Sequence, residues 1–162
     1  ELGCQEGLGS LFFQQNCNLE RYLGIDMDEE AIIWSKENLN EKLEFMKDNF
    51  LISKAQYGTF DAVVSLDVIE HIEDEKRYFE VIVDNLKEEG IAIIGTPNEK
   101  LSPYASEGSK IAHINLYTQE RLYETAIKYF ENVFIFNMND EVVNMGFDPM
   151  SCYIFALCCG KK

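Results

Sequence analysis

The chain contains two histidines, and both have neighbours that suit proton transfer. Asp67, Glu70 and His71 occupy positions i, i+3 and i+4 just after an apolar stretch at 61–66, so a helical turn there would place them on one face. His113 follows a segment rich in serine. Because imidazole titrates near neutral pH, either histidine can accept the proton of a reacting hydroxyl. His71 and His113 are therefore the candidate catalytic residues.

A second group of residues is typical of a nucleoside site. Glycines at positions 3, 7 and 9 let the backbone turn sharply and approach a ligand. Asp26 ends the next apolar stretch, where its carboxylate can accept hydrogen bonds from both hydroxyls of a ribose. Glycines that serve packing alone are the plainer interpretation of this loop.

The charges near the loop disfavour a pyrophosphate. A phosphate group prefers a helix N-terminus without competing anions, but this loop carries Glu1 and Glu6 and no cation follows before Arg21. A ligand with a sulfonium and an ammonium group tolerates these acids. The glycines and Asp26 taken alone still leave a nicotinamide enzyme open.

Two later stretches strengthen the nucleoside interpretation. Asp48-Asn49-Phe50 follows a third short strand, and residues 61–71 (DAVVSLDVIEH) contain a fourth strand and its end. With the glycine loop and Asp26, these stretches resemble the class I S-adenosylmethionine-dependent methyltransferases, and their order holds from residue 1 to the end of the chain. Gln5 stands where many members of that family have a glycine.

This resemblance implies S-adenosyl-L-methionine as the cofactor. The glycine loop would lie against its methionine part, Asp26 would bind the ribose, and Asp48 would meet the adenine amino group. The end of the fourth strand, Ser65 to Asp67, would face the methionine and the reacting methyl. The cofactor-binding residues implied in this way are Glu1, Gly3, Cys4, Gln5, Gly7, Asp26, Met27, Asp48, Asn49, Phe50 and Leu66.

The resemblance also suggests a metal site. In the small-RNA 2′-O-methyltransferases and the ubiquinone-pathway O-methyltransferases, an acid-x-x-Glu-His run holds a divalent ion, and in the RNA enzymes a later histidine joins it. Asp67, Glu70, His71 and His113 are the matching candidates here, with Asp67 in place of a Glu, and such a set would suit Mg, Mn, Fe or Zn. Ile-Glu-His is also common in members without a metal, so we favour a general base and assign no metal.

Alternating strands and helices predict the fold class: a doubly wound, Rossmann-like α/β sheet, mostly parallel, with a C-terminal antiparallel hairpin. The first strand looks truncated, since the glycine loop comes almost at once. Helices are expected at 7–16, after Asp28, at 73–86 and at 118–129. Strands are expected at 22–25, 43–46, 61–66, 90–95, 133–138 and 152–159. Residues 98–112 are expected to form a loop that acts as a lid, with Tyr104, Tyr117 and Phe147 as candidates for an apolar rim.

Composition narrows the class of protein. The 162 residues, 46% of them hydrophobic, predict one domain over 1–162, with an N-terminal strand and helix expected to be missing. The formal charge of −15 argues against a nucleic-acid partner. Five cysteines without a Cys-x-x-Cys spacing indicate reduced thiols and a cytoplasmic location, and the longest apolar runs are too short to span a membrane.

The sequence therefore predicts a methyltransferase that O-methylates a small molecule such as a sugar or another hydroxylated metabolite. The alternative is a degenerate domain that binds the cofactor or a partner protein without catalysis. The acceptor atom and the oligomeric state stay open.

Overall fold

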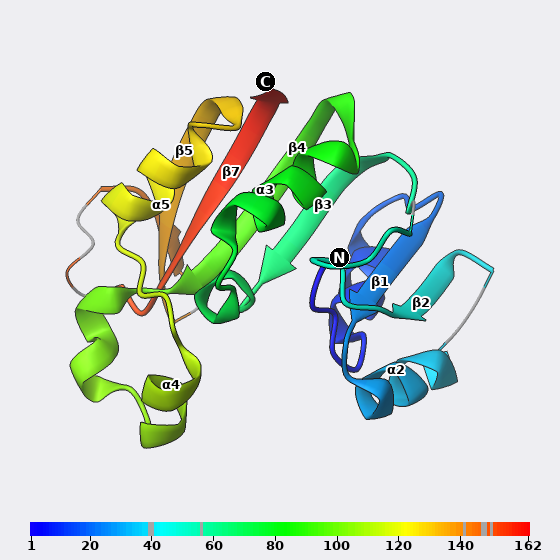
Figure 1. Ribbon diagram of the computed structural model, residues 1–162, viewed down its shortest axis with the longest axis horizontal. Helices are drawn as coiled ribbons and strands as arrows, with labels where there is room; N and C mark the ends of the chain where they lie inside the picture. Colours follow the sequence, from blue (N-terminus) through cyan, green and yellow to red (C-terminus); the bar gives the residue numbers. More distant parts are fainter. Residues whose placement is uncertain (39–40, 56, 141, 147–148, 150) are drawn as a thin grey trace. The chain divides into compact units, whose positions relative to one another are not determined.

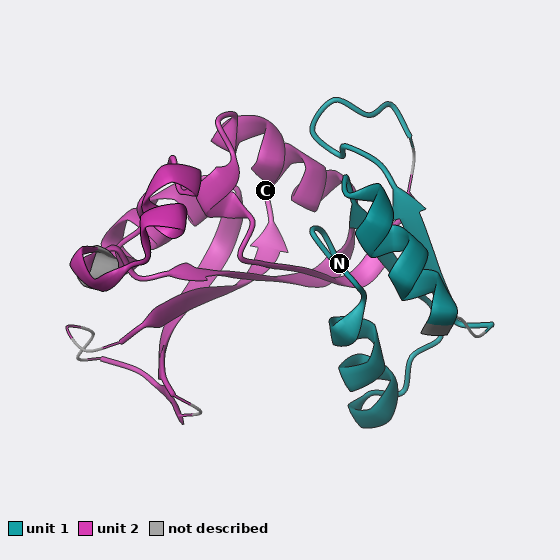
Figure 2. Cartoon of the chain, turned by 90° about the horizontal axis from the view of Figure 1, so that it is seen from below, with its two compact units in different colours: residues 1–56 teal, residues 57–162 magenta. Residues whose placement is uncertain are grey.

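A computed structural model describes residues 1–38, 41–55, 57–140, 142–146, 149 and 151–162, with the side chains at 38, 101 and 102 left undescribed. The chain divides into two compact units, residues 1–56 and residues 57–162 (Figure 2). Each unit has its own sheet and is described separately. That the whole chain is one domain stays a prediction.

Unit 1 is a small parallel α/β unit (Figure 1). Its elements are α1 (Leu8–Asn16), β1 (Tyr22–Asp26), α2 (Glu29–Ser35), the 3-10 helix η1 (Lys36–Asn38) and β2 (Leu43–Lys47). β1 and β2 pair in parallel, with Tyr22 opposite Leu43 and Asp26 opposite Lys47. Leu2 forms one parallel bridge with Ile25, so the residues before the glycine loop run alongside β1. Asp28 caps α2 as predicted, accepting hydrogen bonds from the backbone N–H groups of Glu30 and Ala31.

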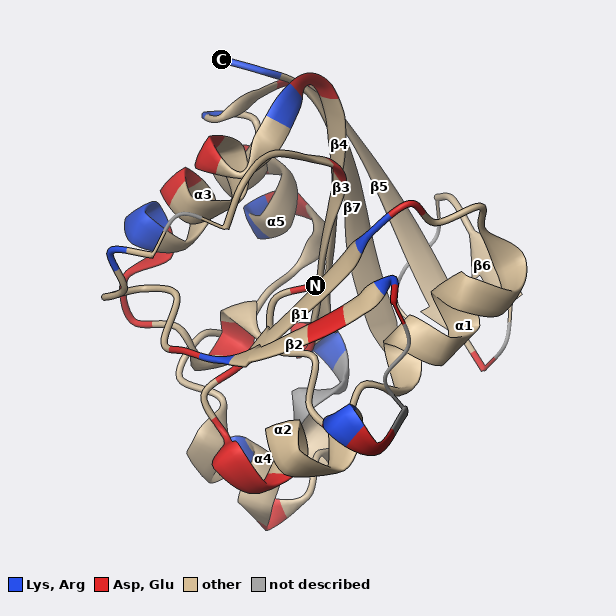
Figure 3. Ribbon diagram, turned by 90° about the vertical axis from the view of Figure 1, so that its right-hand side faces the viewer, with Lys and Arg blue, Asp and Glu red and all other residues tan. Residues whose placement is uncertain are grey.

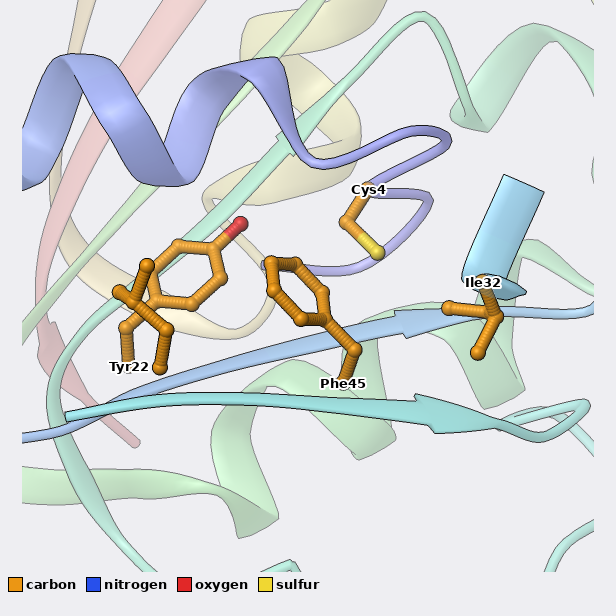
Figure 4. Close-up of a cluster of buried hydrophobic side chains, with 5 residues drawn as sticks. Cys4, Tyr22, Ile32 and Phe45 are labelled. Atoms are coloured by element: carbon orange, nitrogen blue, oxygen red, sulfur yellow. The ribbon is translucent and has the colours of Figure 1, made fainter. Parts of the chain in front are cut away.

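The core of unit 1 joins the glycine loop to the two strands. Its buried residues are Cys4, Tyr22, Ile32, Leu43 and Phe45. In Figure 4 the side chains of Cys4, Tyr22 and Phe45 lie close together over the strands, and the rings of Tyr22 and Phe45 meet edge to face at 5.8 Å. The loop is therefore anchored by packing as well as by its backbone.

Gly24 leaves the space that this packing needs. A Cβ at Gly24 would lie 2.7 Å from Cδ1 of Phe45 and 2.8 Å from Sγ of Cys4. We expect Gly24→Ala to lower the free energy of unfolding by about 1 to 3 kcal/mol, the usual cost of overpacking a core, as measured by urea denaturation. Gly108→Ala is the matched control, because a Cβ there meets only Ser106 Oγ, at 3.8 Å. Equal stability of the two variants would contradict this packing.

Unit 2 is a mixed five-stranded sheet with helices (Figure 1). Its strands are β3 (Phe60–Leu66), β4 (Leu86–Pro97), β5 (Phe130–Asn139), β6 (Val142–Asn144) and β7 (Tyr153–Lys161). Its helices are η2 (Ile69–His71), α3 (Glu75–Asp84), η3 (Glu99–Tyr104), α4 (Glu107–Ala112) and α5 (Gln119–Ala126). The strand order is β3-β4-β7-β5-β6; β3 and β4 are parallel, and the other pairs are antiparallel.

The predicted C-terminal hairpin is confirmed as the antiparallel pair β5 and β7, and the short strand β6 adds to its edge. β4 extends beyond the predicted 90–95 at both ends: it begins at Leu86, and Thr96 and Pro97 still pair with Ile154 and Tyr153 of β7.

The prediction of a loop at 98–112 was wrong. This segment contains η3 and α4, because Ser106, a residue that we took to favour a loop, caps α4 by accepting a hydrogen bond from Ser109 N at 3.1 Å. The residues before and after these two helices are hydrogen-bonded to each other. Asn98 forms a parallel bridge with Tyr117, and Glu99 N donates to Tyr117 O at 2.8 Å.

Charged residues of both signs lie on α3, as its colours in Figure 3 show. On this helix Lys76 pairs with Glu80 at 3.4 Å. Among the described residues, no helix has the length and apolar character that crossing a membrane requires.

Candidate functional site

In the glycine loop of unit 1, four backbone N–H groups donate hydrogen bonds to acceptors within the unit. Gly3 N and Cys4 N both donate to Ile25 O, at 2.8 and 3.2 Å, and Gly7 N donates to Cys4 O at 2.9 Å. Gln5 N donates to Oδ2 of Asp26 at 2.9 Å. A phosphate site needs such groups free and converging on the anion. This loop therefore suits a ligand that carries positive charge better than it suits a pyrophosphate.

The side chains of Glu1 and Cys4 face inward, whereas those of Gln5 and Glu6 are exposed. The Glu1 carboxylate accepts a hydrogen bond from the Tyr22 hydroxyl and lies where a Cβ of Gly9, in the first turn of α1, would fall. Burial raises the pKa of this carboxyl. The space left by Gly7 is filled by the Phe45 ring, and Cys4 is buried, with burial raising the pKa of its thiol to about 12. What these residues offer a ligand is their backbone.

Asp26 ends β1 with both carboxylate oxygens oriented by the backbone. Oδ2 accepts from Gln5 N, and Oδ1 accepts from Asp28 N at 2.9 Å. Each carboxylate oxygen has two acceptor sites, so each keeps one for a ligand hydroxyl. The side chain of the next residue, Met27, is 69% exposed. Two fixed acceptors side by side are what a ribose diol requires.

Asp48 lies beside Asp26, because Asp48 N donates to Asp26 O at 2.9 Å. Its Oδ2 accepts a hydrogen bond from the Ser53 hydroxyl. Asn49 closes a turn by accepting from Leu51 N at 3.1 Å, and Phe50 is buried. Asp26 and Asp48 thus follow the carboxyl ends of two neighbouring parallel strands, where ligands of α/β sheets bind.

In unit 2, the backbone after β3 turns sharply at Asp67. Leu66, which ends the strand, is 40% exposed, and Asp67 has a φ of 54°. Asp67 N donates to Gly95 O at 3.1 Å and to the Tyr153 hydroxyl at 3.2 Å. The predicted helical face shared by Asp67, Glu70 and His71 was therefore wrong, because the chain is left-handed at Asp67 and only η2 follows.

Tyr153 was not predicted from the sequence. It lies on β7, two strands away from β3, and its hydroxyl crosses β4 at Gly95, where a Cβ would come within 2.7 Å of it. This hydroxyl also opposes the effect of burial on the pKa of the Asp67 carboxyl. Burial raises the pKa of Tyr153, so the hydroxyl stays protonated at neutral pH. No local signal marks a partner 86 residues away in the sequence.

Three of the four candidate metal ligands, Glu70, His71 and His113, lie close together. Each can offer one ligand atom to a group within 4.8 Å, and Asp67 does not belong to this group. The two imidazole rings meet edge to face at 5.0 Å. Glu70 is 2% exposed; its Oε2 accepts from Thr96 Oγ1 at 3.0 Å, whereas its Oε1 has no hydrogen-bond partner among the described residues.

The tautomer of His71 follows from its neighbour. Nδ1 lies 2.9 Å from Ala112 O, and a carbonyl oxygen can only accept, so Nδ1 carries a proton. In the neutral ring, Nε2 then keeps a lone pair, 4.0 Å from Glu70 Oε1. A lone pair facing a buried carboxyl calls for a proton or a cation between the two atoms.

Burial shifts the pKa values of the groups in and beside this cluster. It raises the pKa of the Glu70 carboxyl, and it raises that of Asp67 against the opposing effects of Tyr153 and both histidines. Burial and the neighbouring His71 lower the pKa of His113. His113 therefore stays neutral at neutral pH and can accept a proton.

The candidate rim residues lie in different surroundings. Tyr104 is 86% exposed, as a rim requires. Tyr117 is fully buried and its hydroxyl donates to Glu75, so its assignment to a rim was wrong. Phe147 lies outside the described residues.

Comparison with known proteins gives one family. The model of the family described as methyltransferase domain matches residues 1–94. A probable S-adenosylmethionine-dependent methyltransferase of Mycobacterium tuberculosis H37Rv is 29% identical over 98 residues, which cover 60% of this chain and 35% of the relative. A ubiquinone biosynthesis O-methyltransferase of Rickettsia bellii is 31% identical over 108 residues, covering 64% of this chain and 43% of the relative. The chain thus spans less than half the length of these curated relatives.

Among solved structures, the plantazolicin methyltransferase BpumL in complex with SAH superimposes with a TM-score of 0.76 at 17% identity. The match covers 99% of this chain and 74% of BpumL. The match includes residues of both units, so the likeness in fold extends beyond the 94 residues of the family match.

Proposed function

The chain belongs to the methyltransferase-domain family, with the class I fold and the cofactor S-adenosyl-L-methionine, and on this premise we propose that it methylates a hydroxyl group of a small molecule. Relatives named as ubiquinone biosynthesis O-methyltransferases support oxygen as the acceptor atom. A sugar or another hydroxylated metabolite fits this chemistry. The reaction is an in-line transfer, in which the protein mainly positions the acceptor and the methyl group.

The observation that carries the cofactor assignment is the loop in which the N–H groups of Gly3, Cys4, Gln5 and Gly7 are used inside unit 1. Backbone carbonyls and nearby acids remain to meet the ammonium and sulfonium groups of the cofactor. Asp26 would hold the ribose with its two free acceptor sites, and Asp48, with Asn49 and Phe50, would bind the adenine. Met27, which is exposed, would add a contact within unit 1, and Leu66, exposed in unit 2, stays a candidate that the resemblance implies.

Calorimetry of the chain with S-adenosylmethionine, its demethylated product and NAD tests the cofactor assignment. Binding of the first two without NAD is the expected result, and binding of NAD alone would contradict it. Product formation with a panel of hydroxylated acceptors tests the activity. Tight cofactor binding without transfer to any acceptor would favour the alternative, a degenerate domain that binds without catalysis.

For proton removal we propose His113 as the general base. Its lowered pKa keeps it neutral, and His71 beside it is fixed through the hydrogen bond to Ala112. Five free cysteines fit a reducing compartment, so we also propose a cytoplasmic location.

A divalent ion is the second candidate role of the same cluster. The buried Glu70 Oε1, which accepts no hydrogen bond from the part of the chain that the structure describes, fits such an ion together with the nitrogens of His71 and His113. The hydrogen bond from His71 Nδ1 to a backbone carbonyl is the usual support of a metal-binding histidine. An ion there would supply a Lewis acid for the acceptor hydroxyl, with Glu70, His71 and His113 as its ligands.

A further inference from the structure

The segment after His113 is bonded to the helix that carries His71. Ile114 N and Asn115 N both donate to Glu70 O, at 2.9 and 3.0 Å. The side-chain amide of Asn115 donates to Ile72 O, at the end of η2. The distance between the two imidazoles is therefore set by how residues 113–115 rest on η2.

Arg121 holds Asn115 and its neighbours in that position. Its Nη2 donates to Asn115 Oδ1 at 3.1 Å, which turns the amide nitrogen of Asn115 toward Ile72. Its Nη1 donates to Leu116 O at 2.7 Å. The guanidinium also stacks over the Tyr117 ring, 4.3 Å from the centroid.

Glu75 fixes the arginine from a third element. The Glu75 carboxylate, in the first turn of α3, accepts hydrogen bonds from both Arg121 and the Tyr117 hydroxyl. Arg121 itself is oriented by the capped start of α5, where its N–H donates to Thr118 Oγ1 at 3.2 Å. One planar guanidinium thus joins α3, α5 and the segment that bears His113, which a lysine, as a point charge, cannot reproduce.

The geometry points to Arg121 as a positioning residue that sets His113 against His71 through Asn115. This inference rests on the proposed function of His113 and adds to it a residue that does not touch the acceptor. Arg121 is 39% exposed, whereas Leu122 and Ala126 of the same helix are fully buried and anchor it in the core. Loss of Arg121 should therefore disturb the histidine pair more than it disturbs the folding of unit 2.

Histidine-labelled NMR reads this pair directly, since the chain has two histidines. The wild type should show a nuclear Overhauser effect between the rings, whose centroids are 5.0 Å apart. Arg121→Ala and Arg121→Lys should both lose it and lower kcat by about 10- to 100-fold, with an unchanged KM for S-adenosylmethionine. The control is Arg77→Ala, which removes an α3 arginine near Glu80 and should change neither readout. A retained ring contact and a retained kcat in both Arg121 variants would overturn the inference.

Asn115→Leu tests the route through Asn115 and also serves if Arg121→Ala does not fold. It should match the loss of kcat in Arg121→Lys, and the double variant should lose no more than either single variant, because the residues act in series. Losses that multiply would refute that route. If His113→Gln keeps its kcat, the proposed base is wrong, yet the ring contact in the Arg121 variants still decides the positioning role.

Discussion

Replacement of Asp26 by alanine is expected to weaken the binding of S-adenosylmethionine by about 10- to 150-fold. This range corresponds to about 1.5 to 3 kcal/mol for losing a hydrogen-bond partner that carries charge. In the wild type the Asp26 carboxylate accepts hydrogen bonds from the backbone N–H groups of Gln5 and Asp28, and the variant leaves both groups without this acceptor. Calorimetry with the cofactor and with its demethylated product measures the effect.

Asp61→Ala is the matched control for Asp26→Ala. It removes one carboxylate of equal charge, which is 86% exposed and paired with Lys87 at 2.8 Å. Its cofactor affinity should equal that of the wild type. An Asp26 variant that folds normally and binds as tightly as this control would refute the assignment of the ribose.

His113→Gln is expected to lower kcat by about 100- to 10,000-fold, the range for loss of a general base. His71→Gln should cost less, because His71 orients its neighbour and does not take the proton. Activity of the wild type should survive EDTA. It should fall with decreasing pH below the usual imidazole value of about 6.5, because burial and His71 lower the pKa of His113 and protonation removes the base.

The metal candidate predicts a different pattern. EDTA would abolish turnover, Mn²⁺ or Mg²⁺ would restore it, and both histidine substitutions would weaken Mn²⁺ binding measured by calorimetry. That result would replace the general base by a metal centre at Glu70, His71 and His113. Indifference to EDTA and to both substitutions would eliminate both roles and leave positioning alone.

The sequence predicts most of the parallel framework, because its signals are local. Asp28 caps α2, and the β-branched Val63 and Val64 lie in the middle of β3, as their types indicate. Apolar spacing on α3 and α5 is also local, although α5 ends at Ala126, earlier than predicted. Asp26 and His71 could be chosen as candidates because their place at or just after the end of a strand is visible in one short stretch.

The rest depends on contacts between distant residues. Tyr153 reaches Asp67 only because β7 pairs with β4 and Gly95 leaves room. Arg121 on α5 resembles an ordinary surface charge until Glu75 and Asn115 are seen to converge on it. Neither partner can be read from spacing, so the candidate bases were predictable and their support was not.

The segment that contains η3 and α4 begins and ends at places that are bonded to neighbouring parts of unit 2. Glu99 N donates to Tyr117 O, and Ile114 N donates to Glu70 O. A closed excursion of this kind can change in length or composition at little cost, about 0.6 kcal/mol for each doubling of a flexible loop. The bond from Ile114 N to Glu70 O lies directly after His113 and holds this end of the segment against η2. Substitutions within η3 are therefore expected to leave the histidine pair in place.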